Sequence, residues 1–88
     1  REPDRRAEVI IRSSDIDMNM HVNNARYFDI IDDLIPNSAE LKRIRAEYKI
    51  PVKLTDKITA AVFEGEQSIT AVLENEDGKQ CFVFEGIK

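Results

Sequence analysis

The sequence predicts a single α+β domain in which one helix lies across a largely antiparallel sheet. One stretch of about three turns has apolar side chains at helical spacing, whereas the runs before and after it alternate apolar and polar residues as strands do. The last four of these runs are joined by short turns, so neighbouring strands must run antiparallel. At 88 residues, the chain is long enough for one domain, residues 1–88, with a thin core.

The first strand and the helix come first along the chain. Residues 7–12 alternate and are rich in β-branched side chains, which predicts a strand. Four apolar residues then follow at i, i+3, i+4 and i+7 and give a helix one apolar face: Tyr27, Ile30, Ile31 and Leu34. Pro36 ends this helix, predicted over residues 24–35. Either Asn23 or Asn24 can cap its start, because an asparagine oxygen accepts from a free amide in the first turn.

The remaining elements are strands. Residues 42–54 alternate without interruption, which predicts a long strand with one buried and one wet face. Pro51 cannot donate to a ladder, so this strand is expected at a sheet edge or to contain a bulge. Three more strands are expected at 58–64, 67–74 and 79–85. In the last of them Phe82 and Phe84 should share one face and Cys81 the other. The predicted order is β–α–β–β–β–β.

Composition excludes several classes of function. The net charge is −4 at pH 7 and the basic residues are scattered, so a nucleic-acid surface is not expected. No apolar run approaches the roughly 20 residues of a membrane span. A single cysteine gives no internal disulfide and no cysteine-based zinc site, and its natural setting is a reducing cytoplasm. We therefore expect no metal, no cofactor, no nucleic-acid partner and no membrane partner.

A polar stretch at residues 15–24 separates the first strand from the helix and holds the only histidine, three asparagines and two aspartates. Buried amides and carboxylates need partners, so the stretch is either a hydrogen-bonded turn or a site. Asn19 and the free amides at the helix start can donate to a carbonyl oxygen that gains negative charge. His21 can take a proton from water, and Asp17 can hold the Asn19 amide or that water. A lone loop histidine is more often structural, so both interpretations stand on the residues alone.

The same stretch resembles a known family. The run Ser14-Asp15-Ile16-Asp17-Met18-Asn19-x-His21-Val22-Asn23-Asn24-x-x-Tyr27 is similar to the signature of the acyl-acyl carrier protein thioesterases, and in particular to the second of their two tandem hot-dog domains. Ile31-Asp32 and Glu47-Tyr48-Lys49 extend the similarity. The resemblance implies a hot-dog fold, an antiparallel β-sheet wrapped around one central α-helix. It also implies hydrolysis of a fatty acyl thioester, which frees the acid from its carrier and ends fatty acid synthesis.

The resemblance also assigns roles to residues. It implies catalytic roles for Asp17, Asn19 and His21. The expected substrate-binding residues are Met20, Asn23, Asn24 and Tyr27, although for Asn23 and Asn24 a structural role as turn and cap residues is favoured. The implied partners are an acyl-acyl carrier protein as substrate and a second hot-dog domain, as a homodimer or as an N-terminal half. The implied compartment is a bacterial cytoplasm, or the plastid stroma if the source is a plant.

One position departs from the family pattern. Family members carry a catalytic Glu four residues after the Glu of the Glu-Tyr-Lys/Arg segment, and here that position is Pro51. Because proline cannot accept a proton, another acid must substitute or activity is lost; Glu47 and Glu64 are the candidates by pattern. Two alternatives remain: an acyl-CoA thioesterase of the same fold, with a different carrier, or a non-catalytic acyl-binding hot-dog domain in which Pro51 marks the loss of the acid.

Overall fold

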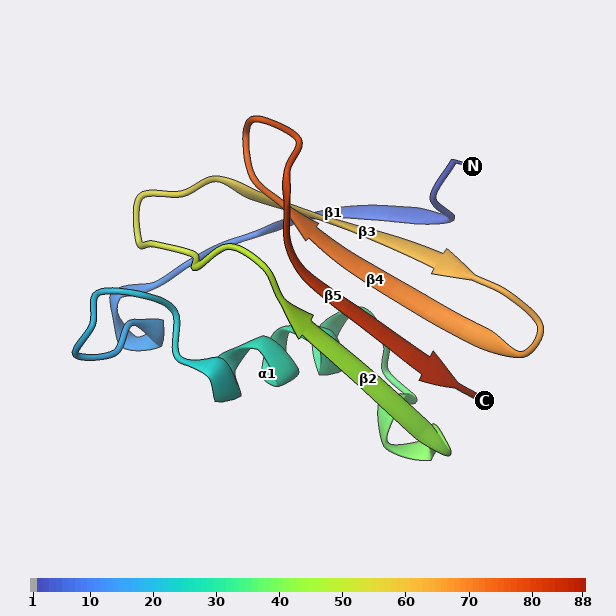
Figure 1. The fold of residues 1–88 in the computed structure, drawn as a ribbon. Coiled ribbons are helices and arrows are strands. Elements are labelled where there is room, and N and C mark those ends of the chain that lie inside the picture. The colour runs from blue at the N-terminus through green and yellow to red at the C-terminus, as the bar shows by residue number, and fades with distance from the viewer. Residues whose placement is uncertain (1) are drawn as a thin grey trace.

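One helix lies in the curve of a five-stranded antiparallel sheet in the computed structural model, which describes residues 2–88 (Figure 1). The elements in chain order are β1 (Arg5–Val9), α1 (Asn24–Leu34), β2 (Arg43–Tyr48), β3 (Ile58–Glu64), β4 (Ser68–Glu74) and β5 (Gln80–Ile87). Two short 3-10 turns, Ser13–Asp15 and Ser38–Glu40, precede and follow the helix. The strands lie in the order β1-β3-β4-β5-β2. The predicted α+β class and the β–α–β–β–β–β order are confirmed.

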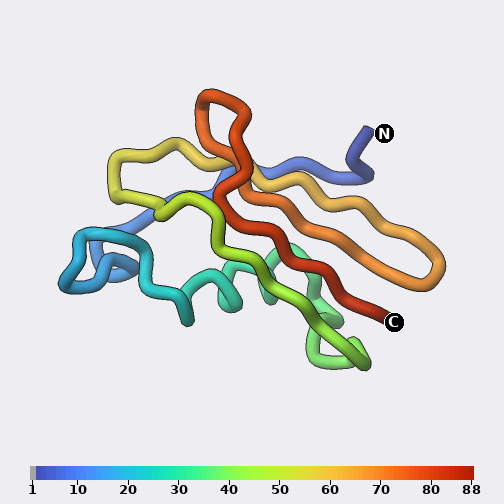
Figure 2. Tube along the Cα trace, viewed as in Figure 1, coloured from blue at the N-terminus to red at the C-terminus, as the bar shows by residue number. Residues whose placement is uncertain are grey.

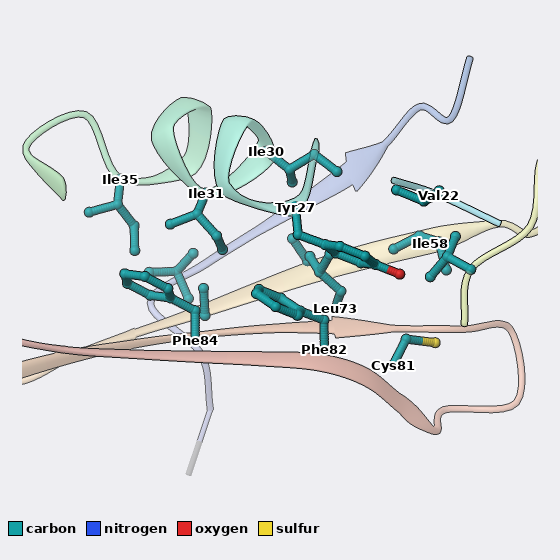
Figure 3. Packing of buried hydrophobic residues seen from close by; sticks show 14 of the residues in the cluster. Val22, Tyr27, Ile30, Ile31, Ile35, Ile58, Leu73, Cys81, Phe82 and Phe84 are labelled. Carbon is teal, nitrogen blue, oxygen red and sulfur yellow. The ribbon is translucent and has the colours of Figure 1, made fainter. Parts of the chain in front are cut away.

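The core lies between α1 and the concave face of the sheet (Figure 3). The helix contributes Tyr27, Ile30 and Ile31, which are buried as the helical spacing predicted. The Tyr27 ring stacks on Phe82 of β5, with centroids 4.7 Å apart and planes inclined by 21°. Phe84, next on the same face of β5, is 2% exposed. This packing fixes α1 against the middle of the sheet, and with it the loop that leads into the helix.

The first strand lies earlier than predicted. It was expected over residues 7–12, but Arg5–Val9 is the segment that pairs with β3, from Arg5 opposite Val62 to Val9 opposite Ile58. Residues 10–12 leave the ladder and lead into the 3-10 turn. Register against β3, rather than local alternation, therefore sets the bounds of β1.

The second strand is shorter than predicted, because it ends at Tyr48 rather than at residue 54. The N–H groups of Lys49 and Ile50 both donate to the Cys81 carbonyl oxygen, at 2.9 and 3.1 Å, so the ladder stops there. Pro51 follows and has no N–H to donate. The expectation of an edge strand is confirmed, since β2 ends the strand order.

Two predictions about which side chains the sheet covers, and on which face they lie, were wrong. Ile44 and Tyr48, on the inner face of β2, are 53% and 46% exposed, because no strand lies beyond this edge to cover them. Cys81 belongs to the core together with Phe82, although the two neighbours were expected on opposite faces. The register shifts between Leu73 and Glu74 of β4, and this bulge turns both side chains inward.

The ends of the sheet differ in what they carry. Both termini and the β3–β4 turn lie at one end, and the loops at residues 16–22 and 49–57 lie at the other (Figure 2). Between residues 2 and 88, no helix has the length and apolar character needed to cross a membrane.

Candidate functional site

Residues 16–22 form a loop that is closed by its own hydrogen bonds. The Asp17 N–H donates to the His21 carbonyl oxygen at 2.9 Å, and Ile16 forms an isolated bridge with Val22. The Asp17 carboxylate oxygen Oδ1 accepts from the N–H groups of Asn19 at 2.9 Å and His21 at 3.4 Å. Asp17 therefore fixes the backbone of the other two predicted catalytic residues, through their main-chain amides.

A buried carboxylate ties this loop to the helix. Asp15 is 8% exposed, and its Oδ1 accepts from Nε of Arg26 at 2.8 Å. Its Oδ2 accepts from the Arg12 N–H at 2.9 Å, and its carbonyl oxygen accepts from the Asn23 N–H at 2.8 Å. Asp15 therefore joins the chain before the loop, through the Arg12 amide, to the start of the helix. Its ion pair with Arg26 could not be predicted from the sequence, because the two residues are eleven positions apart and belong to no shared periodic pattern.

Asn23 caps the helix and Asn24 begins it. The Asn23 side chain accepts from the Ala25 N–H at 2.9 Å, and its backbone is extended, as an N-cap requires. Of the two asparagines that the sequence offered, Asn23 is therefore the cap. Asn24 is the first residue of α1, and it lines the cavity described next.

A cavity of about 340 Å³ opens between this loop and the end of β2. Its lining residues are Asp17, Asn19, His21, Val22, Asn24, Tyr27, Tyr48, Lys49, Ile50 and Pro51. The two walls are joined by a hydrogen bond of 2.7 Å from the Val22 N–H to the Val52 carbonyl oxygen. Five of the seven predicted site residues thus share one cavity, while Met20 and Asn23 lie outside its lining. A volume of this size is at the lower end of small-molecule sites.

Aromatic side chains and one cation complete the cavity wall. Tyr48 meets Tyr27 edge to face, with ring centroids 5.4 Å apart. Burial raises the pKa of the Tyr27 hydroxyl, while a backbone hydrogen bond with Val52 acts in the opposite direction. The Lys49 ammonium donates to Oε1 of Gln80 at 3.1 Å. Tyr48 and Lys49 were not predicted as site residues, and the only sequence signal for them was the Glu-Tyr-Lys segment.

The acid candidates Glu47 and Glu64 are not at this site. Glu47 borders a small hollow on the opposite face of the sheet, because side chains alternate along β2 and its neighbour Tyr48 points inward. Glu64 lines a larger cavity of about 510 Å³ at the far end of the sheet, which contains none of the motif residues. Pro51 does line the site. Among residues 2–88, Asp17 is consequently the only carboxylate in the cavity wall.

Solved structures share this fold. An acyl-ACP thioesterase from Bacteroides thetaiotaomicron superposes with a TM-score of 0.82 at 24% identity, over 98% of this chain and 37% of that one. A 12:0-ACP thioesterase from Umbellularia californica gives 0.77 at 21%, over 97% and 35%. A thioesterase from Thermus thermophilus, complexed with coenzyme A and Zn, gives 0.78 at 19%, over 97% and 82%. The chain therefore has the hot-dog fold of these thioesterases and spans little more than a third of the two acyl-ACP thioesterases.

The sequence itself matches a protein family. No curated protein matches the chain. The family model described as the acyl-ACP thioesterase C-terminal domain matches residues 1–82, which is most of the chain. The chain therefore belongs to the family of acyl-ACP thioesterase C-terminal domains.

Proposed function

We propose that this domain hydrolyses a fatty acyl thioester, and that the acyl group arrives on an acyl carrier protein. The observation that carries the proposal is the convergence of Asp17, Asn19 and His21 on one cavity at the start of α1. Family membership supports thioester hydrolysis as the reaction class. Delivery of the acyl group by a carrier protein is the more specific part of the proposal.

The chemistry follows from the residues in the cavity. A water oxygen forms a bond to the thioester carbonyl carbon, and the carbon–sulfur bond then breaks, which yields the free acid and a thiol. The Asn19 side-chain amide donates to the carbonyl oxygen as it becomes an oxyanion, and the positive end of the α1 dipole stabilises the same charge. His21 takes the proton from the attacking water and returns it to the departing sulfur.

Asp17 has two tasks in this scheme. Its Oδ1 holds the amides of Asn19 and His21, so its Oδ2 can accept a further hydrogen bond from the water or from the imidazole. As the one carboxylate in the described cavity wall, it fills only part of the role of the acid that the resemblance places at the position of Pro51. A second candidate function rests on the same observation: with Pro51 in the wall, the cavity binds an acyl thioester without cleaving it.

We further propose that a second hot-dog domain pairs with the open edge of β2, as a second copy or as the N-terminal half of a tandem protein. Ile44 and Tyr48 are half exposed on the face of β2 that turns toward α1, and Phe28 lies half buried nearby. An edge strand with exposed apolar residues invites pairing. Light scattering should show an assembly of two hot-dog domains, and Ile44→Asp should reduce its mass to that of one chain. A wild-type chain that is strictly monomeric would contradict the homodimer.

Hydrolysis of matched substrates tests the function. The assembled protein should release free acid from an acyl-acyl carrier protein faster than from the matching acyl-CoA. Asn19→Ala and His21→Ala should each lower kcat/KM by about 10²-fold, the usual loss for an oxyanion donor or a general base. Glu47→Gln is the matched control on the opposite face and should leave the rate unchanged. Turnover that is unaffected by both cavity substitutions would contradict the catalytic proposal, and faster cleavage of acyl-CoA would contradict the carrier.

A further inference from the structure

Two exposed methionines flank Asn19 at the mouth of the cavity. Met18 is 99% exposed and Met20 is 70% exposed, and neither lines the cavity itself. Single exposed apolar residues are common, but two on either side of a residue that faces a site form a local apolar contact surface. These side chains therefore project outward from the rim, where anything that delivers a substrate must approach.

The loop backbone holds both methionines in this orientation. The Met20 N–H donates to the Asp17 carbonyl oxygen at 3.1 Å, and the Asp17 carboxylate holds the amides of the residues on either side of Met20. Met20 itself has φ of 64°, in the left-handed region that residues with a Cβ rarely adopt. A conformation with this cost persists only because the surrounding hydrogen bonds determine it. The exposure of the two side chains is thus built into the loop.

The facing loop adds positive charge to the same rim. Residues 49–57 contain three lysines and one aspartate, a net charge of +2 in a chain whose net charge is −4. Lys49, Lys53 and Lys57 are all exposed; Lys49 lines the cavity, whereas Lys57 lines a separate hollow beside β1. The Val22–Val52 hydrogen bond joins this loop to residues 16–22, and the two loops lie side by side in Figures 1 and 2. With Asp17 included, residues 16–22 and 49–57 together carry a net charge of +1 in a chain whose net charge is −4, so the cavity mouth is apolar and more basic than the rest of the chain.

We propose that Met18, Met20, Lys49 and Lys53 form the docking surface for the carrier protein that presents the acyl thioester. This inference rests on the proposed function and names the face that its partner contacts. The complementary partner surface is acidic and has an apolar patch, because lysines attract carboxylates and methionine side chains adapt to an apolar neighbour. The carrier must sit over this rim for its thioester to reach Asn19, so the surface and the site are contiguous.

Binding of a non-hydrolysable substrate tests the surface without requiring turnover. The probe is an acyl carrier protein whose dodecanoyl group is attached through an amide, titrated against the assembled protein. The test variant combines Met18→Ser with Met20→Asn, because asparagine tolerates the left-handed backbone. Lys53→Glu tests the charge. Ile87→Ser is the matched control, since Ile87 is 37% exposed at the opposite end of β5.

The expected result is a Kd for the probe at least about tenfold higher in the methionine variant and in Lys53→Glu, as at an interface hot spot. Ile87→Ser should bind within about twofold of wild type. Raising the salt concentration should weaken wild-type binding, because screening reduces the charge attraction. Binding that is equal in wild type and the methionine variant would overturn the proposal, and so would an absence of binding in wild type. A change in assembly mass in the methionine variant would also overturn it, since the patch would then be a subunit contact.

Hydrolysis of acyl-pantetheine, measured in parallel, separates this inference from the proposed function. If no form cleaves the thioester but carrier binding still depends on the methionines, the docking surface is supported and hydrolysis alone is contradicted.

Discussion

Removing the buried carboxylate of Asp15 should destabilise the domain more than any other loop substitution. Asp15→Ala deletes an ion pair with Arg26 at 2.8 Å and a hydrogen bond from the Arg12 N–H at 2.9 Å. Hydrogen bonds to charged groups contribute about 1.5–3 kcal/mol each when buried. Arg26 is 28% exposed, so solvent screening reduces its share. We expect a loss of about 2–3 kcal/mol in the free energy of unfolding, measured by urea denaturation with an unchanged m-value.

The same arginine supplies the control. Asp29 Oδ2 lies 3.9 Å from Nη1 of Arg26, and the Asp29 side chain is 68% exposed. Asp29→Ala should therefore lower the free energy of unfolding by less than about 0.5 kcal/mol. Asp15→Asn should fall between the two, because its amide oxygen can still accept from the Arg12 N–H but carries no charge for the guanidinium. Equal losses in Asp15→Ala and Asp29→Ala would refute the argument that burial gives the Asp15 pair its strength.

Three further predictions concern the rest of the fold. Burial raises the pKa of Cys81 above its ordinary 9.0 and that of Tyr27 above 10.0, so both groups favour the folded state while they are protonated. Urea denaturation across a pH series should therefore show full stability below about pH 9 and a loss as pH rises through the folded-state pKa values, with a later onset in Cys81→Ala. Gly86→Ala should lower the free energy of unfolding, measured at the thermal midpoint, by about 1–3 kcal/mol, because the new Cβ meets Cδ1 of Leu41; an unchanged midpoint would show that Leu41 moves freely. Asn23→Ala should cost about 1 kcal/mol in urea denaturation through the lost helix cap, whereas Asn23→Asp, which keeps the acceptor oxygen, should not.

Elements with a strong local pattern could be predicted from the sequence. The strand over residues 58–64 has the predicted bounds, because Ile58, Ala60 and Val62 alternate with outward residues on a fully covered face. The apolar face of α1 could also be predicted, because its apolar residues recur at helical spacing and the sheet covers them. The residue types of the site loop and its resemblance to a family signature predicted where the site lies. Five of the seven predicted site residues line one cavity, which is consistent with that prediction.

Features that depend on contacts between distant segments of the chain could not be predicted from local sequence patterns. No local sequence pattern reveals that the Cys81 carbonyl oxygen accepts two N–H groups where β2 ends. None reveals that Arg26 forms an ion pair with Asp15. Exposure of Ile44 depends on whether a second domain covers the edge of β2. The misassignment of Glu47 as a candidate acid was avoidable, because alternation with an inward Tyr48 already places it on the outer face.

The central claim is that the cavity of Asp17, Asn19 and His21 is a thioesterase site whose expected acid position is occupied by Pro51. Pro51→Glu tests it most directly, because a carboxylate at position 51 would join Asp17, Asn19 and His21 in the cavity wall. In the assembled protein, kcat for acyl-acyl carrier protein hydrolysis should rise by about 10²-fold, the lower range for a general base. The same substitution in an Asn19→Ala, His21→Ala background should give no gain. A rate that is unchanged in the otherwise intact protein, with folding confirmed by urea denaturation, would contradict the account, and so would an equal gain in both backgrounds.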